Sequence, residues 1–270
     1  MSENAAGMQD VWQQAESYEQ YIGRWSRQVA RKFVLDLSIA PRSVWLDVGC
    51  GSGALTAAIL ELAEPARVIA LDRSAEFVGH SRRSSSDGRA AFIVGDAVSL
   101  PFADREGGAV VSGLVLNFIA QPELAVREML RCVRRGGVVA TYLWDYREGM
   151  QVIRLFWDSA IALDPRAAEL DEAKRFPLCQ PVALEQLFVS AGAGQVHVSA
   201  ITIPTWFRNF DDLWSPFLGG QGPAPTYAMS LPERDRIALR EHFRQVVPIN
   251  ADGSIALSAK AWIARGVRQN

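Results

Sequence analysis

The chain has 270 residues, 49% of them hydrophobic and 21% charged, and a formal net charge of −2. This balance is typical of a globular protein with one large core, and it gives no electrostatic reason to expect nucleic acid or a membrane as a partner. No apolar run approaches the roughly 18 residues of a membrane span. The polar N-terminus does not resemble a signal peptide, so we expect a cytoplasmic location. Three widely separated cysteines predict neither a disulfide framework nor a metal site.

Large side chains at helical spacing over residues 10–37 predict two helices, separated near Gly23. We therefore expect an N-terminal helical cover over residues 1–40. From Pro41 the pattern alternates between strands at 44–48, 67–71, 91–94, 109–115 and 137–143 and helices at 53–62, 74–83 and 122–133. Such alternation indicates a parallel sheet with helices on both faces.

Beyond Trp144 the alternation is interrupted by two insertions, at about 146–180 and 204–250. A helix near 181–191 and strands at 195–203 and 254–264 would complete the sheet. We thus predict one α/β domain over 41–270, with a Rossmann-like, seven-stranded, mostly parallel sheet and helical insertions over the C-terminal strand ends. The insertion at 146–180 has a helical pattern. The insertion at 204–250 is expected to be irregular and contains the glycine-rich run GGQGPAP, a candidate surface turn or moving gate.

Residues 44–60, VWLDVGCGSGALTAAIL, combine a buried strand, an acidic side chain, a glycine-rich turn and a helix start. Gly49, Gly51 and Gly53 allow the backbone to turn tightly and to approach a ligand closely. Asp47 lies in an apolar strand, where a buried carboxylate needs a partner. A ligand ammonium would provide one, and so would the amides of the turn itself. The segment predicts a nucleoside-binding site.

Two more acids follow the next two strands. Asp72 lies 19 residues after Gly53, the spacing of an acid that accepts hydrogen bonds from ribose hydroxyls. Asp96 could accept from an exocyclic amine of a base, with the amide of Ala97 donating to a ring nitrogen. Because the carboxyl ends of parallel strands line one crevice, the three acids are expected to be neighbours. Taken singly, Asp72 and Asp96 could also be ordinary helix caps.

These segments resemble the class I S-adenosylmethionine-dependent methyltransferases, in particular the small-molecule branch of the ubiquinone and menaquinone methylases. The resemblance covers residues 41–144 and is carried by LDVGCGSG (46–53), ALDRS (70–74), VGDAVSLPFAD (94–104) and the span 107–141. The segment YEQYIGRWSR (18–27) is similar to the lead segment of bacterial members. The resemblance implies S-adenosyl-L-methionine as cofactor and a small molecule, apolar or aromatic, as methyl acceptor.

The resemblance also implies roles for individual residues. Asp47 and the glycine turn would hold the methionyl part, Asp72 the ribose, and Asp96 with Ala97 the adenine. Arg73 is a further cofactor-binding candidate. Tyr21 and Arg24 would contact the cofactor from above, and Leu114 would lie beside its sulfonium end. No metal is implied.

Methyl transfer needs mainly alignment, so a dedicated base is not required. If a base or an orienting group acts, the candidates by position are Asp145 and Tyr142 after the fifth strand and Asn117 after the fourth.

Two other functions are compatible with parts of the pattern. Gly49, Gly51 and Ala54 also satisfy the GxGxxG/A fingerprint of NAD-dependent oxidoreductases, but no tyrosine lies four residues before any lysine, and Asp47 would repel a pyrophosphate. The fold could also serve as a non-catalytic module that binds S-adenosylmethionine. The sequence leaves the natural acceptor and the oligomeric state open.

Overall fold

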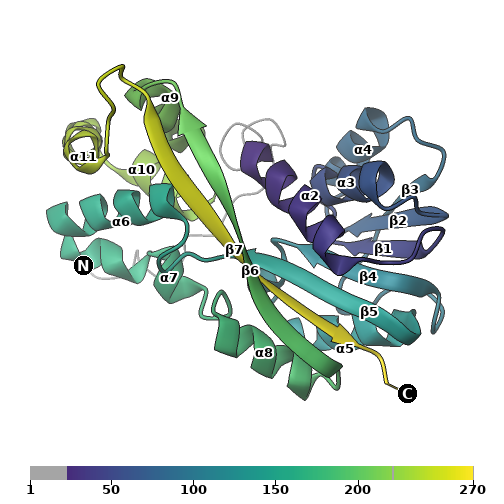
Figure 1. Cartoon of the computed structure of the whole chain (residues 1–270). Coiled ribbons are helices and arrows are strands. Elements are labelled where there is room, and N and C mark those ends of the chain that lie inside the picture. Colours follow the sequence, from purple (N-terminus) through teal and green to yellow (C-terminus); the bar gives the residue numbers. More distant parts are fainter. Residues whose placement is uncertain (1–22, 221, 270) are drawn as a thin grey trace. The chain divides into compact units, whose positions relative to one another are not determined.

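The computed structural model describes residues 23–220 and 222–269, and these residues divide into two compact units (Figure 1). The larger unit comprises residues 26–144, 178–201 and the segment from 261 onward. The smaller unit comprises, of the described residues, 23–25 together with those of 145–177 and 202–260, so it is built mainly from the two insertions. No helix of the described part is long and apolar enough to cross a membrane.

The larger unit contains a doubly wound α/β sheet, as predicted. Seven strands are arranged in the order β3-β2-β1-β4-β5-β7-β6, in which β1 to β5 are parallel and β7 is antiparallel to β5. The strands are β1 Val44–Val48, β2 Arg67–Asp72, β3 Ala90–Val94, β4 Gly107–Gly113, β5 Val133–Trp144, β6 Gly194–Phe207 and β7 Ile255–Val267. The central strands β1, β2 and β4 are buried almost throughout, which explains their nearly continuous apolar sequences.

Helices cover both faces of this sheet. One face carries α2 Arg24–Leu37, α3 Ala54–Leu62 and α4 Ala75–Ser84, and the other carries α5 Pro122–Cys132 and α8 Pro181–Ser190 (Figure 1). In α2 the buried side chains recur at helical spacing, and Phe33 packs on Tyr142 of β5 with ring centroids 4.7 Å apart. The first helix predicted for residues 10–37 lies outside the described residues.

The smaller unit is helical. It contains α6 Gln151–Leu163, α7 Glu172–Arg175, α9 Phe210–Trp214, α10 Pro223–Ser230 and α11 Glu233–Val246, with 3-10 turns η3 Pro165–Glu169 and η4 Ser215–Gly219. Its core is aromatic: Phe156 stacks on Phe217 at 4.5 Å, and Phe243 contacts both rings edge-on. The insertion at 204–250, expected to be irregular, is therefore largely helical. The residues PAP of its glycine-rich run form the first turn of α10, where proline is favoured because its missing N–H is not needed.

Several strand boundaries differ from the prediction by two to four residues; β6 and β7, for example, end at Phe207 and Val267, beyond the predicted 203 and 264. The fourth strand ends at Gly113 and not at 115, because Leu114 adopts a left-handed conformation with φ of 62° that no strand can continue. The fifth strand begins at Val133, four residues earlier than expected, and it absorbs the left-handed Gly136 as an irregularity in its register with β4.

Candidate cofactor site

The glycine-rich turn joins β1 to α3 and is held against the next strand. The amides of Gly49 and Cys50 both donate to the carbonyl of Leu71, at 2.7 and 2.9 Å. Gly49 has φ of 79°, and a Cβ there would lie 2.6 Å from Val115 Cγ2, so no other residue fits. Gly51 also has a positive φ, but nothing lies within 4 Å of its Cβ position. The turn therefore presents bare backbone to open space at Gly51.

Asp47 is fully buried directly before this turn. Its Oδ2 accepts a hydrogen bond of 2.6 Å from Thr56 Oγ1, whereas its buried Oδ1 has no hydrogen-bond partner among the described residues. Burial raises the pKa of Asp47 from 3.8 to about 7, and the nearby charge of Asp72 adds to this, while hydrogen bonds from Thr56 act in the opposite direction. An unsatisfied oxygen of this kind fits a cationic donor from a ligand.

Asp72 ends β2 and connects the two turns that follow β1 and β2. Its Oδ2 accepts from the amide of Gly51 at 2.9 Å, and its Oδ1 accepts from the amide of Ser74 at 2.9 Å. Ser74 in turn caps α4 by accepting from the amide of Phe77. Arg73 is exposed beside it. Asp47 and Asp72 are thus neighbours, as the sheet topology predicts.

Asp96 lies two residues beyond the end of β3. The amide of Gly95 donates to the carbonyl of Asp72 at 3.0 Å, so this loop follows directly on the second acid. Asp96 is exposed, and its Oδ1 accepts from the amide of Val98 at 3.1 Å within a turn closed by Ser99. Ala97 is half-buried beside it. The carboxylate therefore keeps an oxygen available to a ligand.

The segment after β4 carries two more of the predicted residues, Leu114 and Asn117. Leu114 keeps its strained conformation because its amide donates to the carbonyl of Tyr142 at 2.8 Å. The phenol of Tyr142 lies over Gly113, where a Cβ would be only 2.5 Å from the hydroxyl oxygen. Asn117 follows in the short turn η2 Leu116–Phe118, and its Nδ2 is buried without a hydrogen-bond partner in the described part of the chain.

Asp145 follows β5 and belongs to the smaller unit, where it is firmly engaged. Its carboxylate pairs with Lys260 Nζ at 2.7 Å and accepts from the amide of Arg147 at 3.1 Å. The backbone of Asp145 also donates to the carbonyl of Lys260. These bonds account for the burial of this carboxylate and join two segments that are far apart in the sequence.

Arg24 likewise belongs to the smaller unit. Its guanidinium lies over the rings of Trp25 and Phe207, at 4.5 and 4.7 Å from their centroids, and Nη1 is 3.7 Å from Asp212 Oδ1. Partial burial lowers the pKa of Arg24, which the charge of Asp212 counteracts. Its Nε and Nη2 are buried without partners among the described residues. Tyr21 lies outside the described residues.

Two residues of this site have no clear signal in the sequence. Thr56 binds Asp47 from the first turn of α3, and Ser81 Oγ donates to the carbonyl of Gly51 at 2.8 Å from α4. Both are ordinary helix residues by sequence, and only their burial against the turn distinguishes them. Among residues 23–220 and 222–269, no group of three or more histidine, cysteine or acidic residues could hold a metal.

Comparison with known proteins identifies a methyltransferase domain in the chain. Residues 46–141 match a family described as a methyltransferase domain. The chain is 32% identical over 95 residues to a demethylmenaquinone methyltransferase of Roseiflexus sp., covering 35% of this chain and 40% of that protein. It is 26% identical over 188 residues to the 2-methyl-6-phytyl-1,4-hydroquinone methyltransferase of Synechocystis sp., covering 68% and 58%. The chain thus spans less than two thirds of the length of either relative.

Solved structures share the fold at lower identity. Phosphoethanolamine N-methyltransferase 2 of Haemonchus contortus, in complex with S-adenosyl-L-methionine, superposes with a TM-score of 0.58 at 14% identity, covering 95% of this chain and 57% of that one. The 4+2 cyclase SpnF superposes with a TM-score of 0.56 at 16% identity, covering 90% and 82%. At these identities the likeness shows a common fold.

Proposed function

We propose that the protein transfers a methyl group from S-adenosyl-L-methionine to a small apolar or aromatic molecule, on the premise that its core, residues 46–141, belongs to the class I S-adenosylmethionine-dependent methyltransferase family. The observation that carries the proposal is the turn between β1 and α3. There, open backbone at Gly51 lies beside the unsatisfied buried oxygen of Asp47 and the carboxylate of Asp72. An amino acid attached to a ribose would meet both acids.

The proposal assigns each candidate residue to one part of the cofactor. In the proposed complex Asp47 Oδ1 accepts from the ammonium of the methionyl part, and the open backbone of Gly51, within the turn from Gly49 to Gly53, leaves space for it. Asp72, with Arg73 beside it, accepts from the ribose hydroxyls. Asp96 and the amide of Ala97 bind the adenine, and Leu114 lies near the sulfonium. Tyr21 and Arg24 would supply contacts from the N-terminal segment.

The cofactor supplies an activated methyl group and a neutral leaving group, so the protein has to align the acceptor and exclude water. Leu114 is fixed in position by the bond between its amide and Tyr142, and Tyr142 is itself packed on Gly113 and Phe33. Asn117 has a buried donor with no partner among the described residues, and this donor could orient an acceptor oxygen. The ion pair between Asp145 and Lys260 would have to break before Asp145 could act as a base. We therefore favour Asn117 over Asp145 as the group that acts on the acceptor.

The acceptor class is supported by the names of relatives. Two of these names specify quinone-type compounds, demethylmenaquinone and a phytyl hydroquinone. A phenol or hydroquinone with an apolar substituent is the first acceptor to test.

Calorimetric titration with S-adenosylmethionine, S-adenosylhomocysteine and NAD tests the cofactor. We expect the first two to bind and Asp72→Asn to weaken them at least tenfold, because hydrogen bonds to a charged group contribute about 1.5–3 kcal/mol. Asp36→Asn is the matched control: Asp36 is exposed on α2, so its replacement is expected to leave binding unchanged.

Binding of NAD alone would contradict the proposal. Binding of both sulfur compounds without turnover of phenols, hydroquinones or carboxylic acids would instead favour a non-catalytic module. S-adenosylhomocysteine release, followed by mass spectrometry of the acceptor, separates these outcomes.

A further inference from the structure

A row of arginines lies at the amino-terminal ends of the parallel strands, opposite the ends that carry the cofactor site. In the order of the sheet, Arg67 is the first residue of β2, Arg42 precedes β1 by two residues, and Arg105 precedes β4 by two. Arg134 and Arg135 follow at the start of β5. We call these five residues the arginine edge.

The arginine edge is exposed, and it carries no ion pair in the described part of the chain. Two of its members adopt left-handed backbone conformations, Arg42 with φ of 60° and Arg105 with φ of 66°. Glycine would adopt these conformations with less strain, but both positions are arginine in this chain. Their backbones are fixed, since the amide of Arg42 donates to the backbone carbonyl of Glu64 and that of Arg105 donates to the backbone carbonyl of Arg131.

The acidic residues at the same end of the sheet do not neutralise the arginine edge. Asp87 is paired with Arg89 at 2.6 Å, and Asp104 with Arg131 at 2.9 Å. Only Glu64 and Glu106 are left, within the described residues of these loops, to oppose the five arginines. The domain is thus polarised: carboxylates lie at one end of its strands and an excess of guanidinium groups at the other, although the whole chain has a net charge of −2.

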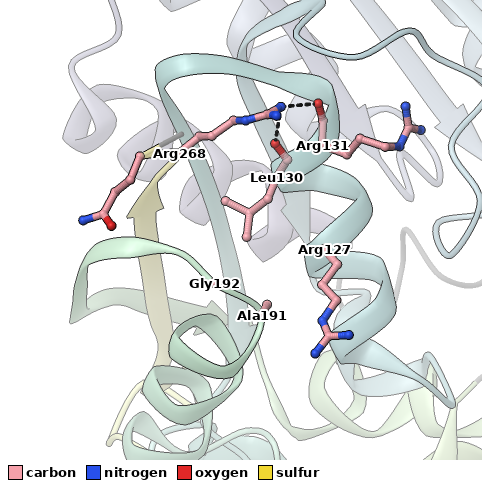
Figure 2. Close-up of a pocket in the computed structure, with 7 residues that line it drawn as sticks. Arg127, Leu130, Arg131, Ala191, Gly192 and Arg268 are labelled. Atoms are coloured by element: carbon pink, nitrogen blue, oxygen red, sulfur yellow. Dashed lines mark hydrogen bonds between the residues drawn. The ribbon is translucent and has the colours of Figure 1, made fainter.

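A hollow of about 270 Å³ lies beside the β5 end of the row and is lined by Arg127, Arg131 and Arg268 (Figure 2). These guanidinium groups do not converge on one point. That of Arg268 donates to the carbonyls of Leu130 and Arg131, which end α5, while the side chains of Arg127 and Arg131 extend away from it (Figure 2). This arrangement does not suit one small anion, and it favours a partner with charges spread over an area.

We propose that the arginine edge is a docking surface for an acidic helix of a partner protein. Neighbouring strands are about 4.8 Å apart, so four strands present their arginines over about 14 Å. Carboxylates at positions i and i+4 of a helix are about 6 Å apart and can each accept from a guanidinium. The interspersed Glu64 and Glu106 and the negative total charge disfavour the continuous phosphates of nucleic acid or of a lipid surface. A helix docked here leaves the cofactor end of the sheet free.

The test uses an alanine-rich helical peptide of about 20 residues with glutamates at i, i+4 spacing on one face, labelled for fluorescence anisotropy. We expect it to bind the full chain at low salt and to dissociate as salt is raised. The variant Arg42→Gly, Arg105→Gly, Arg134→Gln should bind about tenfold more weakly, a difference of about 1.4 kcal/mol. Both glycines suit the left-handed backbone, so this variant is expected to fold.

The control variant, Arg83→Gln, Arg147→Gln, Arg234→Gln, loses the same number of positive charges from exposed positions elsewhere. It should bind the peptide as the natural chain does. The proposal is wrong if both variants lose affinity equally, if the natural chain does not bind the peptide at low salt, or if a scrambled peptide of the same composition binds as well. Tighter binding of single-stranded DNA or phosphatidylserine vesicles, lost in the edge variant, would also overturn it.

Discussion

At the scale of single residues, Asp47 determines how the site responds to pH. Its pKa of about 7 means that the ligand-free protein holds a proton there below neutrality. Because the folded pKa exceeds the unfolded value, this group lowers the stability of the ligand-free protein as pH rises from about 4 to 7. Binding of an ammonium has the opposite requirement, since it needs the ionised carboxylate.

We therefore expect affinity for S-adenosylhomocysteine to fall by up to about tenfold per unit as pH drops below about 7. Asp47→Asn should bind more weakly and lose this slope. Calorimetry in two buffers of different ionisation enthalpy measures the proton released on binding by the natural chain. An identical slope in Asp47→Asn would assign the proton to another group.

At the scale of elements, the backbone after β4 is strained at a single residue, Leu114. Leu114 is left-handed, which costs a non-glycine residue about 1–2 kcal/mol, and its amide is bound to the neighbouring strand at Tyr142. Strained residues of this kind cluster at functional sites. The proposed place of Leu114 beside the methyl group gives a reason for the strain to persist.

Leu114→Gly separates strain from function. We expect its free energy of unfolding to stay within about 1 kcal/mol of the natural value, because relief of strain offsets the lost apolar contact. Methyl transfer should fall at least tenfold once turnover is established. Ser38→Gly is the control, since Ser38 is also left-handed but lies after α2, and it should leave turnover unchanged. Equal turnover in both variants would remove Leu114 from the site.

At the scale of the whole molecule, stability depends on a buried carboxyl in the smaller unit. Glu172 accepts a hydrogen bond from Trp157 Nε1, and the backbone of Ala224 at the start of α10 also binds it. Burial raises the pKa of Glu172 from 4.5 to about 8, with Asp171 adding to the effect and Arg175 opposing it. The group thus connects α6, α7 and α10 in its protonated form.

The pKa of Glu172 is higher in the folded protein than in the unfolded chain, so protonation of Glu172 stabilises the fold. This contribution to the free energy of unfolding is fully present below about pH 4.5 and is lost as pH rises to about 8, at up to about 1.4 kcal/mol per pH unit. Glu172→Gln keeps an acceptor for Trp157 and should flatten this part of the profile. Urea unfolding at several pH values measures it. Glu169→Gln, at an exposed residue paired with Lys174, should keep the natural slope; a flat profile there would contradict the assignment.

Sequence alone predicted the alternation of strands and helices in the larger unit to within a few residues, and it placed Asp47 and Asp72 side by side. These features depend on short-range patterns: buried parallel strands are apolar throughout, glycines mark the tight turn, and parallel strands place their carboxyl ends together. The ends of β4 and β5 were missed because the left-handed Leu114 and Gly136 depend on bonds to neighbouring strands.

Only the tertiary structure decided which side chains meet. The pairing of Asp145 with Lys260, the bond from Thr56 to Asp47, and the contact of Glu172 with Trp157 join residues whose separations follow no local period. The arginine edge is likewise invisible in sequence, because its members are scattered along the chain and are aligned only by the register of the sheet. The local pattern of the sequence determined the elements and the candidate cofactor turn, while long-range packing determined burial, and burial sets the charge states on which the site depends.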